Sequence, residues 1–262
     1  MILNSEMLEW RDSRCGDRNC AAMFRLERLA AALEPKEYPQ DKINQLWMDL
    51  HDFGVPDADW LGRVAELTSK TVNRCLKYGA DALAVVNVGE TTFSGAIPLP
   101  PAWGRGQAVL CNEAEMPVWQ ADTADFVQLA IAPFDTLTLR RSGGKPLIIA
   151  GAHAELPLLP ETLFLRENLA GAKKAAVRLS ALNLQLAYVK KAETSADLIV
   201  KVINPTDAAA DGTLTVSGEV TAACRSNVSE DQDGDPLPLY GNKALLHLLS
   251  KEQLVLRFVR PE

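Results

Sequence analysis

The chain lacks any long hydrophobic run. No apolar stretch among its 262 residues approaches the roughly 20 residues that a membrane-spanning helix needs. Glu6 and Glu9 lie close to the N-terminus, where a secretion signal would carry positive charge. The sequence therefore predicts a soluble protein, and we expect it in the cytoplasm.

Clustered cysteine and an excess of positive charge are also missing. The five cysteines are scattered without a CxxC pair, which excludes the spacing of a zinc knuckle, and we interpret them as reduced packing residues. A net charge of −7 and a pI near 5.1 argue against nucleic-acid or anionic-membrane partners. The basic stretch from Arg11 to Arg28 interleaves acidic residues, so we interpret it as a solvated helix face.

What the chain does contain is a helical pattern in its N-terminal part. Apolar residues recur at spacings of three and four over 23–33 and again over 43–53. A third helix is predicted over 61–76, with Asp57 or Asp59 as its cap and Gly79 as its stop. These helices predict a small bundle over 1–78.

After Gly79 the apolar residues alternate with polar ones and turn residues recur, which indicates strands of an all-β sandwich. The Gly- and Pro-containing stretch 142–146 is the best boundary inside this β-region. We therefore predict a first β-part over 79–142 and a C-terminal β-sandwich over 143–262. The fold class is α+β by segregation, a three-helix bundle followed by an all-β sandwich region, and no internal repeat is evident.

Four segments carry the most specific patterns, in a fixed order. The first is a helix with Tyr38-Pro39 and Trp47 that ends at His51-Asp52. The others are the strand Ala84-Val85-Val86-Asn87-Val88 with Gly95-Ala96-Ile97-Pro98-Leu99, then Met116-Pro117-Val118-Trp119-Gln120 with 131–139, and finally 189–206 with the closing strand 254–258. This order resembles the C-terminal half of glycoside hydrolase family 38, the α-mannosidases and mannosylglycerate hydrolases.

The resemblance implies hydrolysis of α-mannosidic bonds and a divalent metal, usually zinc, that grips the sugar hydroxyls. His51 matches the family's metal-binding histidine, and Asp52 matches the neighbouring carboxylate that contacts substrate. The family's catalytic α/β domain, which holds the nucleophilic aspartate, has no counterpart in this chain. We therefore predict no catalytic residue here, an inactive chain on its own, and zinc that this chain alone does not bind. The implied partners are an α-mannoside or related sugar and a separate catalytic subunit or a second copy of the chain.

A simpler interpretation of His51 stays open. One imidazole and one carboxylate cannot close a zinc site, which takes three or four protein ligands, and His153 and His247 have no ligand spacing to His51. A histidine at a helix end is also typical of pairing with the C-terminal helix dipole. In the acidic run 230–235, counting from Asp231 puts Pro236 at the position of the glycine in a calcium loop, so we interpret the run as a solvated turn.

Aromatic side chains are the remaining candidates for sugar binding, because the C–H groups of a pyranose face stack on their rings. Trp103, Trp119 and Tyr240 are predicted in or near loops of the β-region, whereas Trp47 and Trp60 are expected to pack inside the bundle. The alternative function is therefore a non-catalytic carbohydrate-binding or structural subunit.

Overall fold

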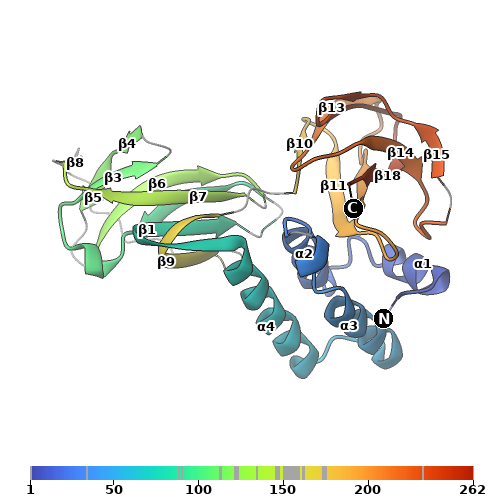
Figure 1. Ribbon diagram of the computed structural model, residues 1–262, viewed down its shortest axis with the longest axis horizontal. Helices are drawn as coiled ribbons and strands as arrows, with labels where there is room; N and C mark the ends of the chain where they lie inside the picture. Colours follow the sequence, from blue (N-terminus) through green and yellow to red (C-terminus); the bar gives the residue numbers. More distant parts are fainter. Residues whose placement is uncertain are drawn as a thin grey trace. The chain divides into compact units, whose positions relative to one another are not determined.

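The computed structural model divides the chain into two compact units (Figure 1). Unit 1 combines Met1–Thr71 with Ala175–Glu262, and unit 2 is Val72–Lys174. The structure describes residues 2–33, 35–87, 89, 91–111, 114–120, 124–133, 135–144, 148–149, 160, 163–172, 176–231 and 233–261. The fold is mixed α+β with a strand-rich part, and in the described residues no helix is both long and apolar enough to cross a bilayer.

The boundaries of these units differ from the predicted segments 1–78, 79–142 and 143–262. Residues far apart in sequence share unit 1, since its helices and its strands come from opposite ends of the chain. The change from helix to strand also comes earlier than Gly79, because the first strand begins at Leu76. Leu76 pairs with Ala172 there, so a long-range strand ladder prevails over the local stop signal of the glycine.

Four α-helices lie in the described residues, one more than the sequence predicts. They are α1 (Ser5–Ser13), α2 (Ala21–Ala30), α3 (Gln40–Phe53) and α4 (Ala58–Cys75), with short 3-10 turns η1 (Pro35–Glu37) and η2 (Pro101–Trp103). The side chain of Asn4 caps α1 by accepting a hydrogen bond from the Met7 amide at 2.9 Å. The side chain of Asp57, one of the two predicted caps, likewise accepts a hydrogen bond from the Trp60 amide at the start of α4.

The helix α3 carries the His51-Asp52 pair. Its apolar face is buried as predicted, with Ile43, Trp47 and Leu50 almost fully covered. It ends at Gly54, which adopts a left-handed conformation (φ 80°) and donates its amide hydrogen to the Leu50 carbonyl. The same turn therefore stops the helix and leaves His51 and Asp52 in its last turn.

The strands of unit 1 form two sheets. One has the order β11-β12-β18-β14-β15 and the other the order β10-β13-β17-β16, and all of their described pairings are antiparallel. The strands are β10 (Val177–Ser180), β11 (Gln185–Lys191), β12 (Leu198–Ile203), β13 (Ala210–Val216), β14 (Ala222–Ser226), β15 (Asp233–Pro236), β16 (Leu239–Tyr240), β17 (Lys243–Leu248) and β18 (Gln253–Val259).

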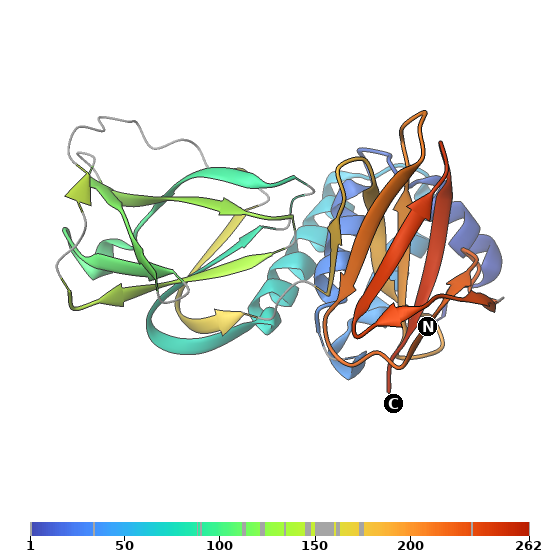
Figure 2. The same ribbon diagram turned by 90° about the horizontal axis from the view of Figure 1, so that it is seen from above.

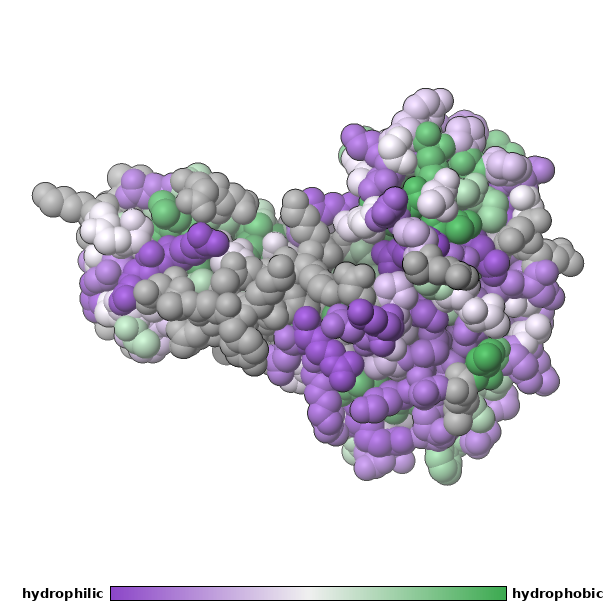
Figure 3. Space-filling view, viewed as in Figure 1, coloured by the Kyte–Doolittle hydropathy of each residue, from purple (hydrophilic) through white to green (hydrophobic). Residues whose placement is uncertain are grey.

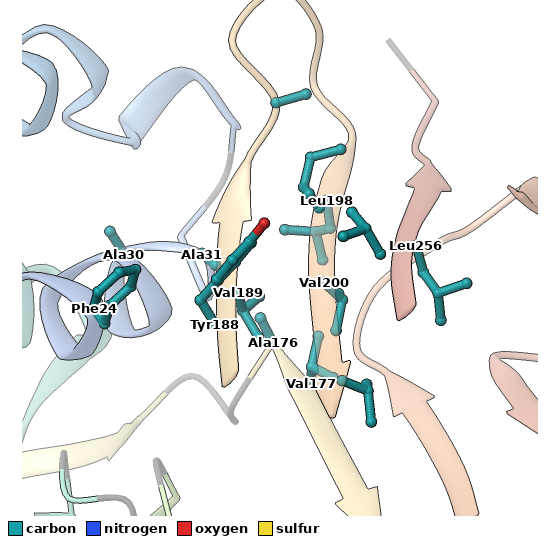
Figure 4. Packing of buried hydrophobic residues seen from close by; sticks show 14 of the residues in the cluster. Phe24, Ala30, Ala31, Ala176, Val177, Tyr188, Val189, Leu198, Val200 and Leu256 are labelled. Atoms are coloured by element: carbon teal, nitrogen blue, oxygen red, sulfur yellow. The ribbon is translucent and has the colours of Figure 1, made fainter. Parts of the chain in front are cut away.

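A single hydrophobic cluster joins these sheets to the helices of the same unit. Phe24 and Ala30 of α2 face Tyr188 of β11, and the cluster continues through Val200 to Leu256 (Figure 4). Figure 2 shows the C-terminal strands, drawn in orange and red, stacked beside the N-terminal helices in blue. Neither the helices nor the sheets of unit 1 can bury their apolar face without the other.

Unit 2 also has two sheets, with the orders β4-β3-β7-β1-β9 and β2-β6-β5-β8. Their core is a second hydrophobic cluster that includes Val85, Trp103, Val127 and Leu139. The strands are β1 (Leu76–Asn87), β2 (Phe93–Pro98), β3 (Ala108–Cys111), β4 (Ala114–Met116), β5 (Val118–Gln120), β6 (Asp125–Ile131), β7 (Thr136–Ser142), β8 (Ile148–Ile149) and β9 (Leu163–Ala172).

The two units contain the same arrangement of strands, although no internal repeat is evident in the sequence. The succession β4-β3-β7-β1 in unit 2 matches β15-β14-β18-β12 in unit 1, and β2-β6-β5 matches β13-β17-β16. The registers agree residue by residue: Ala82 pairs with Arg140 as Ile199 pairs with Arg257, and Phe93 pairs with Ile131 as Ala210 pairs with Leu248. Through β1, β2, β6 and β7 the offset is constant at 117 residues (204 − 87).

A buried asparagine makes the same turn in both copies. The Asn87 side-chain amide donates to carbonyls 4, 44 and 45 residues further along, those of Thr91, Ile131 and Ala132. The Asn204 amide donates to Ala208, Leu248 and Leu249, at the same three separations. Each asparagine oxygen accepts the backbone amide two residues ahead. The two copies therefore share the same hydrogen-bonded turn, although they show no extended sequence identity.

Candidate functional site

The predicted metal and substrate residues, His51 and Asp52, lie on the surface of unit 1 at the end of α3. Their side chains are 40% and 70% exposed, and His51 Nδ1 lies 3.4 Å from Asp52 Oδ1. The imidazole also stands edge-on to the Trp10 ring, with the ring centroids 4.8 Å apart. The pair is therefore accessible to a ligand, and Trp10 holds one side of the imidazole.

The described residues of this chain do not complete a zinc site around His51. No group of three or more His, Cys, Asp or Glu side chains with metal-binding geometry occurs among them. Structural and catalytic zinc sites take three or four protein ligands, and His51 with Asp52 supplies at most two. His153 lies outside the described residues. Any zinc held at His51 would need further ligands from outside the described residues.

Two exposed apolar side chains follow the pair directly. Phe53 is 75% exposed and Val55 is 69% exposed, on either side of the turn at Gly54. The apolar spacing predicts Phe53 on the buried face of its helix, but the last turn of α3 extends past the core and leaves the ring in solvent. Exposed apolar groups beside an accessible polar pair are a feature of interaction surfaces.

The three predicted sugar-contact aromatics occupy different settings. Trp103 is only 4% exposed and packs in the core of unit 2. Trp119 lies in β5, half-buried, and its ring is stacked on Phe126. Tyr240 lies in β16 of unit 1 and is 66% exposed, so its ring is open to a ligand. Trp119 and Tyr240 hold equivalent places in the repeat, since they pair with the equivalent residues Phe126 and Lys243.

A buried ion pair lies in the stretch that the charge pattern assigns to a solvated helix face, and that assignment is wrong for Arg11. Arg11 is 1% exposed, and its guanidinium binds both carboxylate oxygens of Glu27. It also lies over the rings of Phe24, Trp47 and Tyr188. Burial alone would lower the pKa of Arg11, but the Glu27 carboxylate more than reverses this effect and raises it above its ordinary value. The guanidinium therefore stays charged inside the core.

A second buried ionic cluster centres on Glu193 and connects the helices to the β-region of unit 1. Its carboxylate accepts hydrogen bonds from the backbone amide of Leu3 and from the side chains of Gln40, Asn44 and Lys190. Lys190 also binds Glu230 at 2.5 Å. Glu230 thus belongs to this cluster, which corrects the prediction that the acidic run beginning there is entirely a solvated turn.

Comparisons with known proteins return structural matches only. No family model matches the chain, and no curated protein matches it. An α-mannosidase from Enterococcus faecalis V583 aligns over 98% of this chain and 54% of its own, with a TM-score of 0.30 and 9% identity. A protein in glycosyl hydrolase family 38 from Enterococcus faecalis aligns over 98% and 56%, with a TM-score of 0.31 and 9% identity. The chain spans about half the length of these structures.

Proposed function

We propose that this chain is a non-catalytic part of an α-mannosidase-like glycoside hydrolase, in which His51 and Asp52 complete a sugar site on a separate catalytic domain. The observation that carries the proposal is the accessible His51-Asp52 pair at the end of α3. It stands in the sequence order that resembles family 38, after Tyr38-Pro39 and Trp47. The helical segments predicted over 23–33, 43–53 and 61–76 overlap α2, α3 and α4.

The chemistry of the pair suits a shared site better than an autonomous one. A retaining glycosidase needs two carboxyl groups about 5–5.5 Å apart, one as nucleophile and one as acid/base. Asp52 is a single exposed carboxylate, so a partner must supply the nucleophile. When bound, zinc would coordinate sugar hydroxyls, with His51 as one of its protein ligands. Phe53 and Val55 would be covered by the same partner, which would remove their apolar surface from water.

Activity measurements on the chain with and without a catalytic partner test this proposal. We expect the purified chain with added zinc or cobalt to release no p-nitrophenol from the α-mannoside. Co-expression with an α/β catalytic domain of the same source should give activity, and His51→Ala should lower it by about 100-fold or more, as for loss of a group that acts on the transition state. Glu66→Ala is the matched control, because Glu66 is an exposed carboxylate of α4 that pairs with Lys70.

Two results would count against the proposal. Turnover by the chain alone that disappears in His51→Ala would show a complete site within this chain. Activity of the co-expressed pair that is unchanged by His51→Ala would leave His51 as a residue that only pairs with the helix dipole.

A second function, a non-catalytic carbohydrate-binding module, is favoured by one observation. Tyr240 presents an exposed ring on a short strand, which is the platform that a sugar face requires. Sugar-dependent quenching of tryptophan fluorescence without turnover supports this function over the first.

A further inference from the structure

Because the two units share a strand arrangement, comparing equivalent positions indicates which surface residues the sandwich fold needs. Asp211 of β13 pairs with His247 of β17, and the equivalent pair in unit 2 is Ser94 with Ala130. A glycine follows the first residue of each pair, Gly212 after Asp211 and Gly95 after Ser94. The fold therefore tolerates small neutral residues at both places, and the carboxylate and imidazole of unit 1 are additions that folding does not require.

These two side chains form a close polar pair on the surface. His247 Nδ1 lies 2.7 Å from Asp211 Oδ1, while the side chains are 63% and 84% exposed. The remaining polar atoms of the pair, Nε2 of His247 and Oδ2 of Asp211, can contact a ligand.

A hollow of about 540 Å³ lies beside this pair. Its walls include Ser180 of β10, Leu182 and Asn183 of the following loop, and Ala209 and Asp211 at the start of β13. Small-molecule sites commonly have volumes of roughly 300–1,000 Å³. Within the described part of unit 2, no strand takes the place of β10 beside β2, so the hollow belongs to unit 1.

The position of the loop that walls the hollow is constrained by Gly212. A Cβ atom at this glycine would come within 2.9 Å of both Ala181 Cβ and Leu184 Cδ1. The loop from Ala181 to Leu184 therefore packs directly on the backbone of β13. Close packing of this kind holds the loop that carries Asn183 against the strand that carries Asp211.

We propose that this hollow, together with the Asp211–His247 pair, binds a neutral sugar ring. Asp211, Asn183 and Ser180 line this hollow, and the His247 imidazole lies against the Asp211 carboxylate. These polar groups match the alternating donors and acceptors of a polyhydroxylated ligand. The Asp211 carboxylate disfavours an anionic ligand. Leu182, which is fully exposed, offers an apolar surface for the C–H face of the ring.

Hydrophobic residues gather over this sandwich, in contrast to the largely hydrophilic helical segment (Figure 3). The site uses neither His51 nor Asp52 and does not depend on the function proposed above.

NMR titration of the full chain with the methyl α-glycosides of mannose, glucose and galactose tests the site. We expect at least one of them to cause saturable shifts in the backbone amides of 180–183, 209–211 and 247, with a Kd on the order of 1 mM. The variants Asp211→Ser and His247→Ala install the residues of the other copy, so they should fold. Each should weaken binding about tenfold, because each removes one hydrogen bond in which one partner is charged or polarised.

The repeat also provides the control. Ser94→Ala changes the equivalent position in unit 2 and should leave the titration unchanged. Absence of saturable shifts with all three glycosides overturns the proposal, as does binding that survives in both Asp211→Ser and His247→Ala. Loss of activity in His51→Ala has no bearing on this titration, so the two proposals fail separately.

Discussion

Replacing Asn204 with aspartate is expected to destabilise unit 1 by about 3–5 kcal/mol, which is the cost of an uncompensated buried charge. Asn204 is 1% exposed, and its amide donates to three carbonyl oxygens. Aspartate has the same shape but places a negative oxygen against those carbonyls. A drop in melting temperature of roughly 6–12 °C should follow for each 3 kcal/mol lost in a unit of this size.

The repeat turns this substitution into a paired experiment. Asn87→Asp should cause a similar loss that is confined to unit 2, because its hydrogen bonds stay inside that unit. Hydrogen exchange followed by mass spectrometry can report each unit separately through the peptides that cover β6 and β17. Asn242→Asp is the control, because that side chain is exposed and donates one hydrogen bond, to Gly218. Equal protection of β17 in Asn204→Asp and the unmodified chain would refute the role of this turn.

Replacing Glu27 with alanine is the second change with a large expected effect. It removes the carboxylate that binds Arg11 and that accepts the Trp47 indole hydrogen at 2.9 Å. The guanidinium would then be buried without its carboxylate partner, and burial would lower its pKa. Loss of one partner of a buried pair costs about 3–5 kcal/mol. We expect this loss in urea unfolding followed by the fluorescence of Trp47.

Removing both charges should restore much of the lost stability. In Arg11→Met with Glu27→Leu, apolar side chains fill a site that Phe24, Trp47 and Tyr188 already line. Replacement of a buried ion pair by apolar residues of similar volume is often neutral or stabilising. Glu66→Ala is the matched control, since Glu66 forms an exposed pair with Lys70, and it should change stability little. A double variant no more stable than Glu27→Ala would mean that the pair itself is required.

The sequence predicts the amphipathic helices well but misses their charged contacts. The apolar positions of α2 and α3, such as Met23, Leu26, Ile43 and Trp47, are buried as their spacing indicates. The helix α1 has no such period, because a buried position on it is the arginine Arg11. Its partner Glu27 lies 16 residues away. Lys190 on β11 likewise forms an ion pair with Glu230, which is distant in sequence. Long-range ion pairs leave no local pattern from which burial could be read.

The repeat shows the same limit for the β-region. Alternation predicts strands, but the shared asparagine turn depends on contacts between residues 44 and 45 positions apart. Short similarities mark the equivalent segments, such as Met116-Pro117-Val118-Trp119 and Leu237-Pro238-Leu239-Tyr240. For the candidate site, the predicted residues fall into both units, and the Asp211–His247 pair is visible only once β13 and β17 are placed side by side.

The order of unit 1 along the chain has a consequence for synthesis on the ribosome. Its helices emerge first, but the β11 strand that covers Phe24 comes only after all of unit 2 has been made. At translation rates of about 5–20 residues per second, the helices wait roughly 5–20 s for their sheet. Unit 2 can fold during that interval, whereas the apolar faces of α2 and α3 stay uncovered in the nascent chain. We therefore expect the newborn N-terminal segment to be the part of this protein that molecular chaperones bind.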